Sequence, residues 1–374
     1  MLYNSNRSKL KAIISGGGTG GHIFPAIAIA NTLKKRVPEA EILFIGARDK
    51  MEMEKVPAAG YPIEGLWISG LQRKLTWQNL AFPVKVISSL NKAKKIINRF
   101  KPDVVIGVGG FASGPTLRAA TGVKIPALIQ EQNSYPGITN KLLAKRVDRI
   151  CVAYEGMEKY FPEEKIVLTG NPVRQEVIDI AGKKSEAVEF FGLDTTQKIL
   201  LVIGGSLGAL AVNKGVLANL ENFRKNNIQV IWQTGKYFYP TATTETSTMD
   251  LTGIRIIAFI DRMDFAYAAA DVIISRAGAI AISEICAVAK PTIFVPLPTA
   301  AEDHQRKNAQ ALVDKHAAIL IPNHEVQDKL QETVTDLIKN DQQQVEFISN
   351  LKKLAIKDAS ERIVDEILKL IKQA

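Results

Sequence analysis

Short, almost wholly apolar runs alternate with amphipathic segments along this chain. In its first half we predict five strands, at residues 11–15, 41–45, 103–108, 126–130 and 149–153. Residues 24–33 and 84–99 carry apolar side chains at helical spacing, which predicts helices there. Strands without inside–outside alternation are buried on both faces, which is typical of a parallel sheet covered by helices.

The same pattern begins again in the second half. A strand at 198–203, a glycine loop at 204–208 and a helix at 209–220 repeat the opening order, and β-branched runs follow at 229–233, 254–259, 272–275 and 292–295. We therefore predict an α/β protein of two tandem Rossmann-like domains with a cleft between them. The predicted domains are 1–170 and 171–356, joined near 169–174, with a C-terminal helix at about 357–374 that packs back on the first domain.

Composition narrows the class of protein. The 374 residues are 46% hydrophobic and 23% charged, which excludes disordered, collagen-like and coiled-coil chains. Cys151 and Cys286 are too few for a disulfide framework, which favours a reducing compartment. The first apolar run is too short for a signal peptide, and the apolar stretch 277–301 contains charges and three prolines. We expect neither an export signal nor a membrane span.

Charge is distributed unevenly along the chain, whose net charge is +10. Residues 1–150 hold 23 Lys and Arg against 9 Asp and Glu, whereas the remainder holds 25 against 29. The basic half predicts an anionic partner, either a membrane surface, a nucleic acid or a phosphorylated substrate, with general solubility as the alternative. No helix-turn-helix, RNA-recognition or zinc-finger signature occurs, which disfavours nucleic acid.

One segment of the basic half, residues 71–85, mixes Leu, Trp and Phe with Arg and Lys. This composition is typical of an amphipathic segment at the surface of an anionic membrane. A core helix with a solvated basic face is the alternative. The residues that we predict to contact the membrane are Arg73, Lys74, Leu75, Trp77, Leu80, Phe82 and Lys85.

Glycine-rich loops follow several of the predicted strands. Loop one (16–22) contains G-x-G-x-x-G, and loop two (107–115), loop three (204–209) and the segment 275–278 follow later strands. The exposed backbone amides of such loops bind phosphate. Any one of these segments is compatible with a simple tight turn, but the four together favour a phosphate-bearing ligand. A dinucleotide enzyme also needs an acid at the end of its second strand. Residues 45–48 have none and Asp49 lies beyond them, which disfavours NAD.

Six motifs occur in a specific order: GGGTGGHIFPAIAIA at 16–30, EQNSYPGITNK at 131–141, TGNPVR at 169–174, GGSLGA at 204–209, SRAGAIAISEI at 275–285 and EDHQRKNA at 302–309. Together they resemble the bacterial glycosyltransferases that convert lipid I into lipid II for peptidoglycan, over nearly the whole chain. The resemblance implies the GT-B architecture and inverting transfer of GlcNAc from UDP-GlcNAc to the 4-hydroxyl of MurNAc in undecaprenyl-linked lipid I. It also implies peripheral attachment to the cytoplasmic face of the cell membrane and a possible place in a cell-wall synthesis complex.

The resemblance also implies roles for individual residues at the donor. Glu284 would bind both ribose hydroxyls of the uridine, Ile260 the uracil through its backbone, and Ser206 the diphosphate. Arg174 would counter the charge that grows as UDP departs. The remaining implied donor contacts, mainly to the sugar, are Gln305, with His304 beside it, Asn133, Thr19, Gly20 and Gly21.

His22 is the predicted catalytic base, because an inverting displacement needs a group to take the acceptor proton. The helix N-terminus at His22 should lower its pKa and keep it neutral. Alternatively, His22 orients the acceptor diphosphate. Glu131 is a second candidate base, and Phe111 stands where the family carries Tyr. The predicted acceptor-diphosphate contacts are Gly18, Gly109 and Gly110.

Neither a D-x-D pair nor an H-E-x-x-H motif occurs, so we expect no metal and no cofactor, with Arg174 and helix N-termini neutralising the diphosphate. Three alternatives stay open. The first is a UDP-GlcNAc 2-epimerase or another GT-B glycolipid transferase. The second is a non-catalytic nucleotide-sugar-binding scaffold, and the third is a dehydrogenase.

Overall fold

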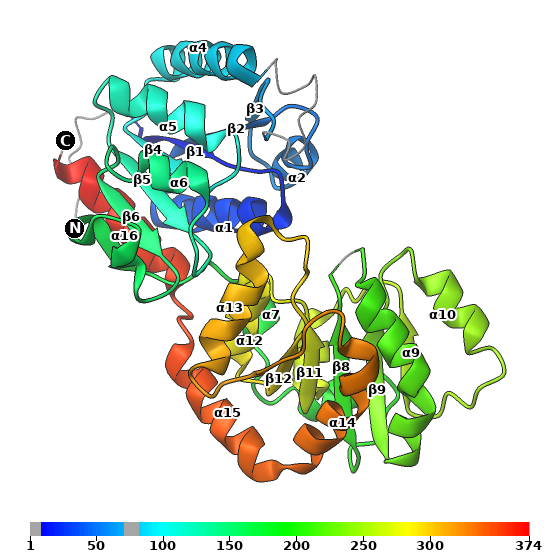
Figure 1. The fold of residues 1–374 in the computed structure, drawn as a ribbon. Coiled ribbons are helices and arrows are strands. Elements are labelled where there is room, and N and C mark those ends of the chain that lie inside the picture. Colours follow the sequence, from blue (N-terminus) through cyan, green and yellow to red (C-terminus); the bar gives the residue numbers. More distant parts are fainter. Residues whose placement is uncertain (1–8, 71–81, 206, 374) are drawn as a thin grey trace. The chain divides into compact units, whose positions relative to one another are not determined.

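The computed structural model describes residues 9–70, 82–205 and 207–373. The chain forms two compact units (Figure 1). Unit 1 comprises Met1–Pro172 and Lys357–Ala374, and unit 2 comprises Val173–Ile356. Each unit contains one sheet whose strand pairs are all parallel, and helices cover the sheet. The predicted α/β class with two Rossmann-like domains is therefore confirmed.

Unit 1 contains a seven-stranded sheet in the order β3-β2-β1-β4-β5-β6-β7. The strand order reverses between β1 and β4, which pair directly although they are far apart in sequence. The central strands are almost wholly buried, because helices cover both of their faces. The strands are β1 Lys11–Ser15, β2 Glu41–Ala47, β3 Ile63–Leu66, β4 Val104–Gly107, β5 Ala127–Glu131, β6 Arg149–Val152 and β7 Ile166–Leu168.

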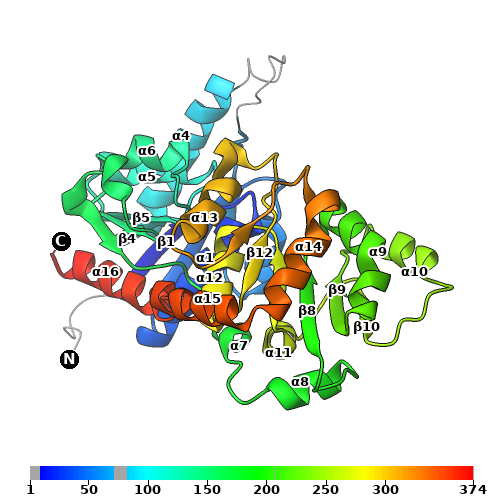
Figure 2. The ribbon, with the colours of Figure 1, turned by 60° about the horizontal axis from the view of Figure 1, so that its bottom comes forward.

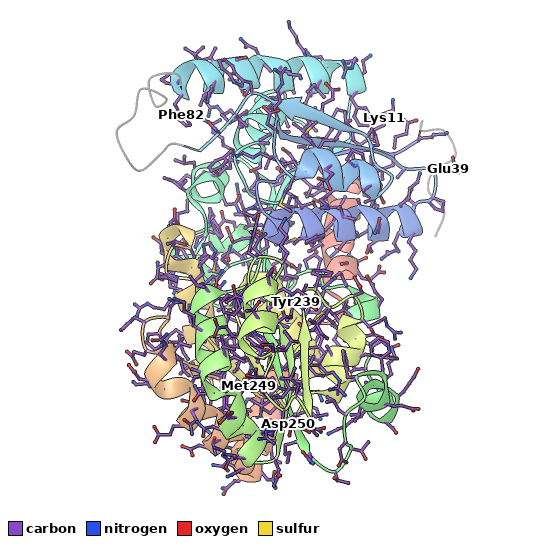
Figure 3. All side chains as sticks on the ribbon, turned by 90° about the vertical axis from the view of Figure 1, so that its right-hand side faces the viewer. Lys11, Glu39, Phe82, Tyr239, Met249 and Asp250 are labelled. Atoms are coloured by element: carbon purple, nitrogen blue, oxygen red, sulfur yellow. The ribbon has the colours of Figure 1, made fainter. Side chains whose placement is uncertain are left out.

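Different helices cover the two faces of this sheet. Helices α1 (Gly20–Arg36) and α16 (Ala359–Gln373) form one core with the strands, and α16 also contacts β4 and β5 (Figure 2). Helices α4 (Phe82–Phe100) and α5 (Ser113–Gly122) form the core of the opposite face. Figure 3 draws all described side chains and labels Phe82 at the start of α4. The shorter helices of unit 1 are α2 Glu52–Ala58, α6 Ile138–Leu143, η1 Met157–Lys159 and η2 Glu163–Lys165.

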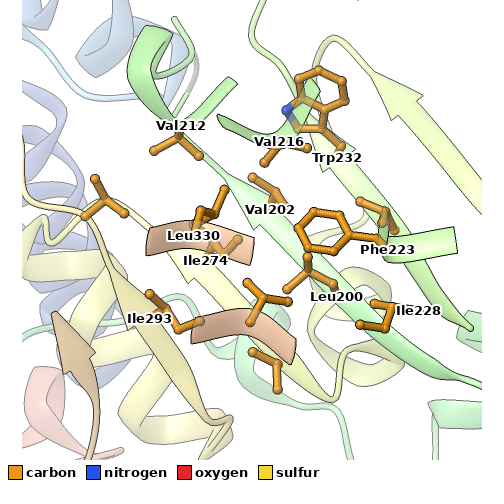
Figure 4. Packing of buried hydrophobic residues seen from close by; sticks show 14 of the residues in the cluster. Leu200, Val202, Val212, Val216, Phe223, Ile228, Trp232, Ile274, Ile293 and Leu330 are labelled. Carbon is orange, nitrogen blue, oxygen red and sulfur yellow. The ribbon is translucent and has the colours of Figure 1, made fainter. Parts of the chain in front are cut away.

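Unit 2 contains a six-stranded sheet in the order β10-β9-β8-β11-β12-β13. Its strands are β8 Lys198–Ile203, β9 Ile228–Gln233, β10 Ile254–Ile257, β11 Val272–Ser275, β12 Thr292–Phe294 and β13 Ile319–Leu320. Helices α9 (Leu210–Lys225) and α14 (Val326–Lys339) pack on one face around Trp232 and Phe223 (Figure 4). The other helices are α7 Gln175–Ile178, α8 Lys184–Phe190, α10 Tyr239–Glu245, α11 Met263–Ala269, α12 Ala279–Val288, η3 Ala301–Asp303, α13 His304–Val313 and α15 Asp341–Leu354.

Every predicted strand is present: three have the predicted bounds, and the ends of the others differ by one or two residues. The pattern missed β3, β7 and β13, which all lie at an edge of their sheet. Each is at most four residues long and partly exposed, so its apolar signal is weak. In the described part of the chain, no helix is both long and apolar enough to cross a membrane.

Candidate functional site

In unit 1, the predicted loops leave neighbouring strands at one edge of the sheet. Loop one follows β1, loop two begins at the end of β4, and the segment 132–137 follows β5. Because β1, β4 and β5 are adjacent and parallel, their carboxyl ends lie side by side, along the edge of the sheet at which its strands end. Open α/β sheets bind ligands at this edge, beside the strands where the order reverses.

Two glycines of loop two let it contact loop one. Gly109 and Gly110 have φ angles of +91° and +83°, which favour glycine. A Cβ atom at Gly110 would lie 2.3 Å from the Gly17 carbonyl oxygen, and one at Gly109 would lie 2.7 Å from Cδ2 of His22. The two loops therefore form one surface, on which the His22 ring lies against bare backbone.

His22 lies in the first turn of α1, and the contact of its Nδ1 atom fixes how the ring can act. Nδ1 is 3.0 Å from the Gly17 carbonyl oxygen and 3.3 Å from Thr19 Oγ1. A carbonyl oxygen only accepts hydrogen bonds, so Nδ1 carries the proton in this contact. The lone pair of the neutral ring is then on Nε2, as a base requires.

Glu131, the other candidate base, is a buried carboxylate at the end of β5 with four hydrogen-bond donors. Its Oε1 accepts from the backbone and side-chain amides of Asn133, at 3.0 and 3.1 Å. Its Oε2 accepts from the Gly137 amide (3.2 Å) and the Asn140 side chain (2.8 Å). Burial raises the pKa of Glu131, and these hydrogen bonds oppose that rise. The arrangement favours a role in shaping the 132–137 segment and aiming Asn133.

One buried acid in unit 1 was not predicted from the sequence. Glu52, at the start of α2, is 1% exposed, and its carboxylate accepts hydrogen bonds from the amides of Gly18 and Ala47. Since Glu52 is seven residues beyond the predicted end of β2 at Ile45, its spacing gave no signal of a contact with loop one.

In unit 2, loop three and the segment 275–278 flank the strands β8 and β11, where the order of the second sheet reverses. Gly208, with a φ of +83°, packs so closely that a Cβ would lie 2.1 Å from the Thr234 carbonyl oxygen. Ser206, the predicted diphosphate contact, lies outside the described residues.

Arg174 and Glu284 are 110 positions apart in sequence, yet they form an ion pair. Both Nε and Nη2 of Arg174 donate to Glu284 Oε1, at 3.1 and 3.0 Å, and the Tyr267 hydroxyl donates to Oε2 at 3.2 Å. Glu284 is 4% exposed, whereas the Arg174 side chain is 47% exposed. Burial raises the pKa of Glu284, and Arg174 and Tyr267 oppose the rise. Burial also raises the pKa of Tyr267, so its hydroxyl stays a donor.

The other predicted donor contacts in unit 2 already have partners within the chain. The Ile260 amide donates to Gln233 Oε1 (2.9 Å), while Gln233 Nε2 donates to the Gly205 carbonyl (3.2 Å). Gln305 Oε1 accepts from the Leu297 amide (2.9 Å). For its amide to contact uracil, Ile260 would have to exchange Gln233 for the base. Gln233 and Tyr267 were not predicted, because only the folded chain brings them to these partners.

Most of the predicted membrane contacts cannot be described: Arg73, Lys74, Leu75, Trp77 and Leu80 lie outside the described residues. Phe82 and Lys85 lie in the first turn of α4. Lys85 Nζ donates to Ser69 Oγ (3.0 Å) and lies 5.7 Å from the ring centre of Trp67. Trp67, Val84 and Ile87 are 45%, 58% and 61% exposed, so the start of α4 adjoins apolar and basic side chains.

Two models of one glycosyltransferase family match the chain. The glycosyltransferase family 28 N-terminal domain matches residues 12–152, and its C-terminal domain matches residues 199–363.

Across residues 9–70, 82–205 and 207–373, no group of three or more His, Cys, Asp or Glu side chains is placed to hold a metal ion.

Relatives of nearly the same length are similar over their whole sequences. The UDP-N-acetylglucosamine–N-acetylmuramyl-(pentapeptide) pyrophosphoryl-undecaprenol N-acetylglucosamine transferase of Parabacteroides distasonis is 53% identical, over 97% of this chain and 99% of that protein. The crystal structure of Acinetobacter baumannii MurG is 28% identical with a TM-score of 0.79, over 96% of this chain and 99% of that one. The UDP-GlcNAc 2-epimerase of Neisseria meningitidis, crystallised with UDP-GlcNAc, shares the fold, at 16% identity and a TM-score of 0.65, over 97% and 100% of the two chains.

Proposed function

The chain belongs to glycosyltransferase family 28, and from this premise we propose that it transfers GlcNAc from UDP-GlcNAc to the MurNAc 4-hydroxyl of lipid I, forming lipid II. It is an N-acetylglucosaminyltransferase with the GT-B architecture of two Rossmann-like domains. The product is a precursor of peptidoglycan, so the activity serves cell-wall synthesis.

The observation that carries the proposal on the donor side is the buried carboxylate of Glu284. Its two oxygens are oriented by Tyr267 and Arg174, at the end of the sheet where nucleotides bind in open α/β folds. Two carboxylate oxygens suit the two hydroxyls of a ribose. When Glu284 binds the ribose, Arg174, which is half exposed, is available to neutralise the diphosphate.

The proposed chemical step uses His22 as the base, and a proton on Nδ1 supports this role because it leaves the lone pair on Nε2. Nε2 takes the proton of the acceptor hydroxyl, whose oxygen forms a bond to C1 of GlcNAc. The bond from C1 to the β-phosphate oxygen breaks, and UDP leaves with the electron pair. Attack opposite the leaving group inverts C1, which gives a β linkage. Asn133, aimed by Glu131, is the proposed contact to the GlcNAc sugar, and Gly18, Gly109 and Gly110 offer bare backbone to the acceptor diphosphate.

A lipid-linked acceptor requires contact with a bilayer. We propose peripheral attachment at the cytoplasmic face of the membrane, through residues 71–85 and the basic face of α4. The exposed Val84 and Ile87 support this placement, since apolar and basic groups together suit an anionic interface. A membrane surface is then a partner of the enzyme besides its two substrates, and a cell-wall synthesis complex is a further proposed partner.

Labelled UDP-GlcNAc and a lipid I analogue test the function. We expect label in the lipid product, release of UDP, and the same rate with and without EDTA. Glu284→Ala should raise the donor KM by about 10- to 100-fold, because it loses hydrogen bonds to a charged group. His22→Ala should lower kcat by about 100-fold or more.

Other results would identify the alternatives. A water-soluble sugar product from UDP-GlcNAc alone would indicate an epimerase, and another labelled lipid would indicate a different glycolipid transferase. Binding of UDP-GlcNAc without turnover would indicate a scaffold. Activity that vanishes with EDTA and returns with Mg²⁺ would contradict the proposed role of Arg174.

A further inference from the structure

Glu52 is a buried acid whose partners are amides and not a cation. Its Oε2 accepts from the Gly18 amide at 2.9 Å, and its Oε1 accepts from the Ala47 amide at 3.0 Å. Within the described residues it forms no ion pair. Burying a carboxylate without a cation is costly, even when amides solvate it. Side-chain packing alone therefore does not explain why a glutamate occupies position 52, buried against loop one.

The amide that Glu52 holds belongs to the same peptide group that contacts the catalytic histidine. The peptide between Gly17 and Gly18 donates its N–H to Glu52 and accepts the Nδ1 proton of His22 at its carbonyl oxygen, 3.0 Å away. Carboxylate, peptide and imidazole thus form one hydrogen-bonded chain. Hydrogen bonds in such chains polarise one another, and an anion at one end strengthens them.

Glycines make room for this carboxylate. A Cβ at Gly17 would lie 2.2 Å from Glu52 Oε1, and one at Gly46 would lie 2.6 Å from Glu52 Cγ. Gly17 and Gly18 have φ angles of +146° and +86°. A peptide between two glycines rotates readily, because neither residue has a Cβ to restrict it. The Gly18–Glu52 hydrogen bond removes that freedom.

We propose that Glu52 is a positioning residue that acts on His22 through the Gly17–Gly18 peptide group. It holds the carbonyl oxygen toward Nδ1, which keeps the proton there and the lone pair on Nε2, and its charge makes the imidazole a stronger base. In serine proteases a carboxylate orients the histidine by direct contact. Here one peptide group stands between them. This inference rests on the proposed role of His22 as the base.

No other ionisable side chain comes from the two loops around the ring. Apart from His22 itself, loop one and loop two contain only Gly, Thr, Val, Phe, Ala, Ser and Pro, and α2 contributes Glu52. A change in the pH profile that Glu52→Gln shows and a control substitution on α2 does not show is therefore the readout for this carboxylate.

The test compares Glu52→Gln with Glu54→Gln. Glu52→Gln keeps the size of the side chain but removes its charge and turns an amide donor toward Gly18 or Ala47. We expect kcat to fall roughly 10- to 100-fold with the donor KM unchanged. Loss of the anion disfavours the imidazolium, so the acid limb of the kcat/KM profile should move to lower pH. Glu54, on the same helix but 76% exposed and paired with Lys55, is the matched control and should behave as wild type.

Variants of His22 separate this inference from the proposed function. If His22→Ala keeps its kcat, the base assignment fails. If His22→Ala lowers kcat while Glu52→Gln matches wild type in kcat and pH profile, the positioning role alone is overturned. Adding Glu52→Gln to His22→Ala should cause no further loss of kcat. If the double variant instead loses kcat by the product of the two single factors, Glu52 acts independently of His22.

One measurement needs only the wild-type protein, so it holds even if Glu52→Gln fails to fold. Nitrogen-15 NMR of labelled histidine should show the neutral His22 ring protonated on Nδ1. A neutral ring protonated on Nε2 would overturn the proposed action of Glu52 on His22 through the Gly17–Gly18 peptide group.

Discussion

Three buried carboxylates organise the loops at the carboxyl edges of the two sheets. Glu52 holds loop one, Glu131 holds the segment 132–137, and Glu284 joins Arg174 to Tyr267. Each carboxylate is less than 5% exposed. Hydrogen bonds to a charged acceptor are worth about 1.5–3 kcal/mol each, so these acids fix side chains and loops in place before substrate arrives.

Tyr267→Phe tests whether Tyr267 orients the carboxylate of Glu284, the proposed ribose-binding group, in this way. The substitution keeps the ring and removes the hydroxyl that donates to Glu284 Oε2. We expect the donor KM to rise roughly tenfold with kcat nearly unchanged. The Tyr267 hydrogen bond lowers the pKa of Glu284, so its loss should raise that pKa. As the pH falls, Glu284 of the variant should therefore become protonated, and donor binding should begin to weaken, at a higher pH than in wild type. Steady-state kinetics between pH 5 and 9 measure both effects.

The control is Tyr61→Phe, which removes a hydroxyl that donates to Asn31 in unit 1 and should leave the donor KM unchanged. Equal KM values for the two variants would mean that Tyr267 does not orient Glu284.

At this scale the sequence predicted residues that belong to contiguous motifs. Glu284, Arg174 and His22 stand in such motifs, and the structure adds partners that orient each of them. Glu52, Tyr267 and Gln233 were missed, because their importance comes from contacts between segments that are distant in sequence. No local pattern encodes such contacts.

The elements themselves follow from apolar periodicity and glycine placement. The central strands were predicted because burial on both faces demands apolar runs, whereas the edge strands β3, β7 and β13 lack that demand. Loop two was predicted as a glycine loop, and the structure shows why two of its glycines are required: they let it contact loop one.

Gly110→Ala should damage the acceptor side selectively. Its φ of +83° disfavours Ala, and the new Cβ would clash with the Gly17 carbonyl oxygen, which is backbone and cannot easily move. We expect a loss of about 1–3 kcal/mol in unfolding free energy and a lower kcat/KM for lipid I, with UDP affinity unchanged. Calorimetry and the transfer assay measure these quantities.

Gly122→Ala is the matched control. Gly122 is the last residue of α5, and a Cβ there meets nothing within 4 Å. Stability and activity should equal or exceed those of wild type, since Ala favours a helix. Identical behaviour of both alanine variants would contradict the close approach of the loops.

At the scale of the whole molecule, the two units differ in net charge. Unit 1 carries 29 Lys and Arg against 17 Asp and Glu, whereas unit 2 carries 19 against 21. This imbalance favours an approach in which unit 1 faces an anionic surface, and salt should weaken it, because the Debye length is about 10 Å at 0.1 M.

Charge reversal tests the proposed membrane contact. Replacing Arg73, Lys74 and Lys85 by Glu should weaken binding to vesicles of anionic lipid at least about tenfold, since each basic residue contributes about 1 kcal/mol. UDP affinity should not change. The same reversal at Lys198, Arg224 and Lys225 of unit 2 should leave vesicle binding close to wild type. Sedimentation with vesicles at several salt concentrations gives the answer, and unchanged binding of the first variant would remove the contact from the proposal.

Helix α16 lies in unit 1 although the chain reaches it only after unit 2. Its residues Ile363, Ile367 and Leu370 share a core with Ile29 and Leu33 of α1. At a synthesis rate of 5–20 residues per second, the ribosome needs roughly 10–40 s to make unit 2 before α16 exists. Throughout that interval the apolar face of α1 lacks the α16 side chains that cover it in the folded protein. The core of unit 1 is therefore completed only after unit 2 has been translated.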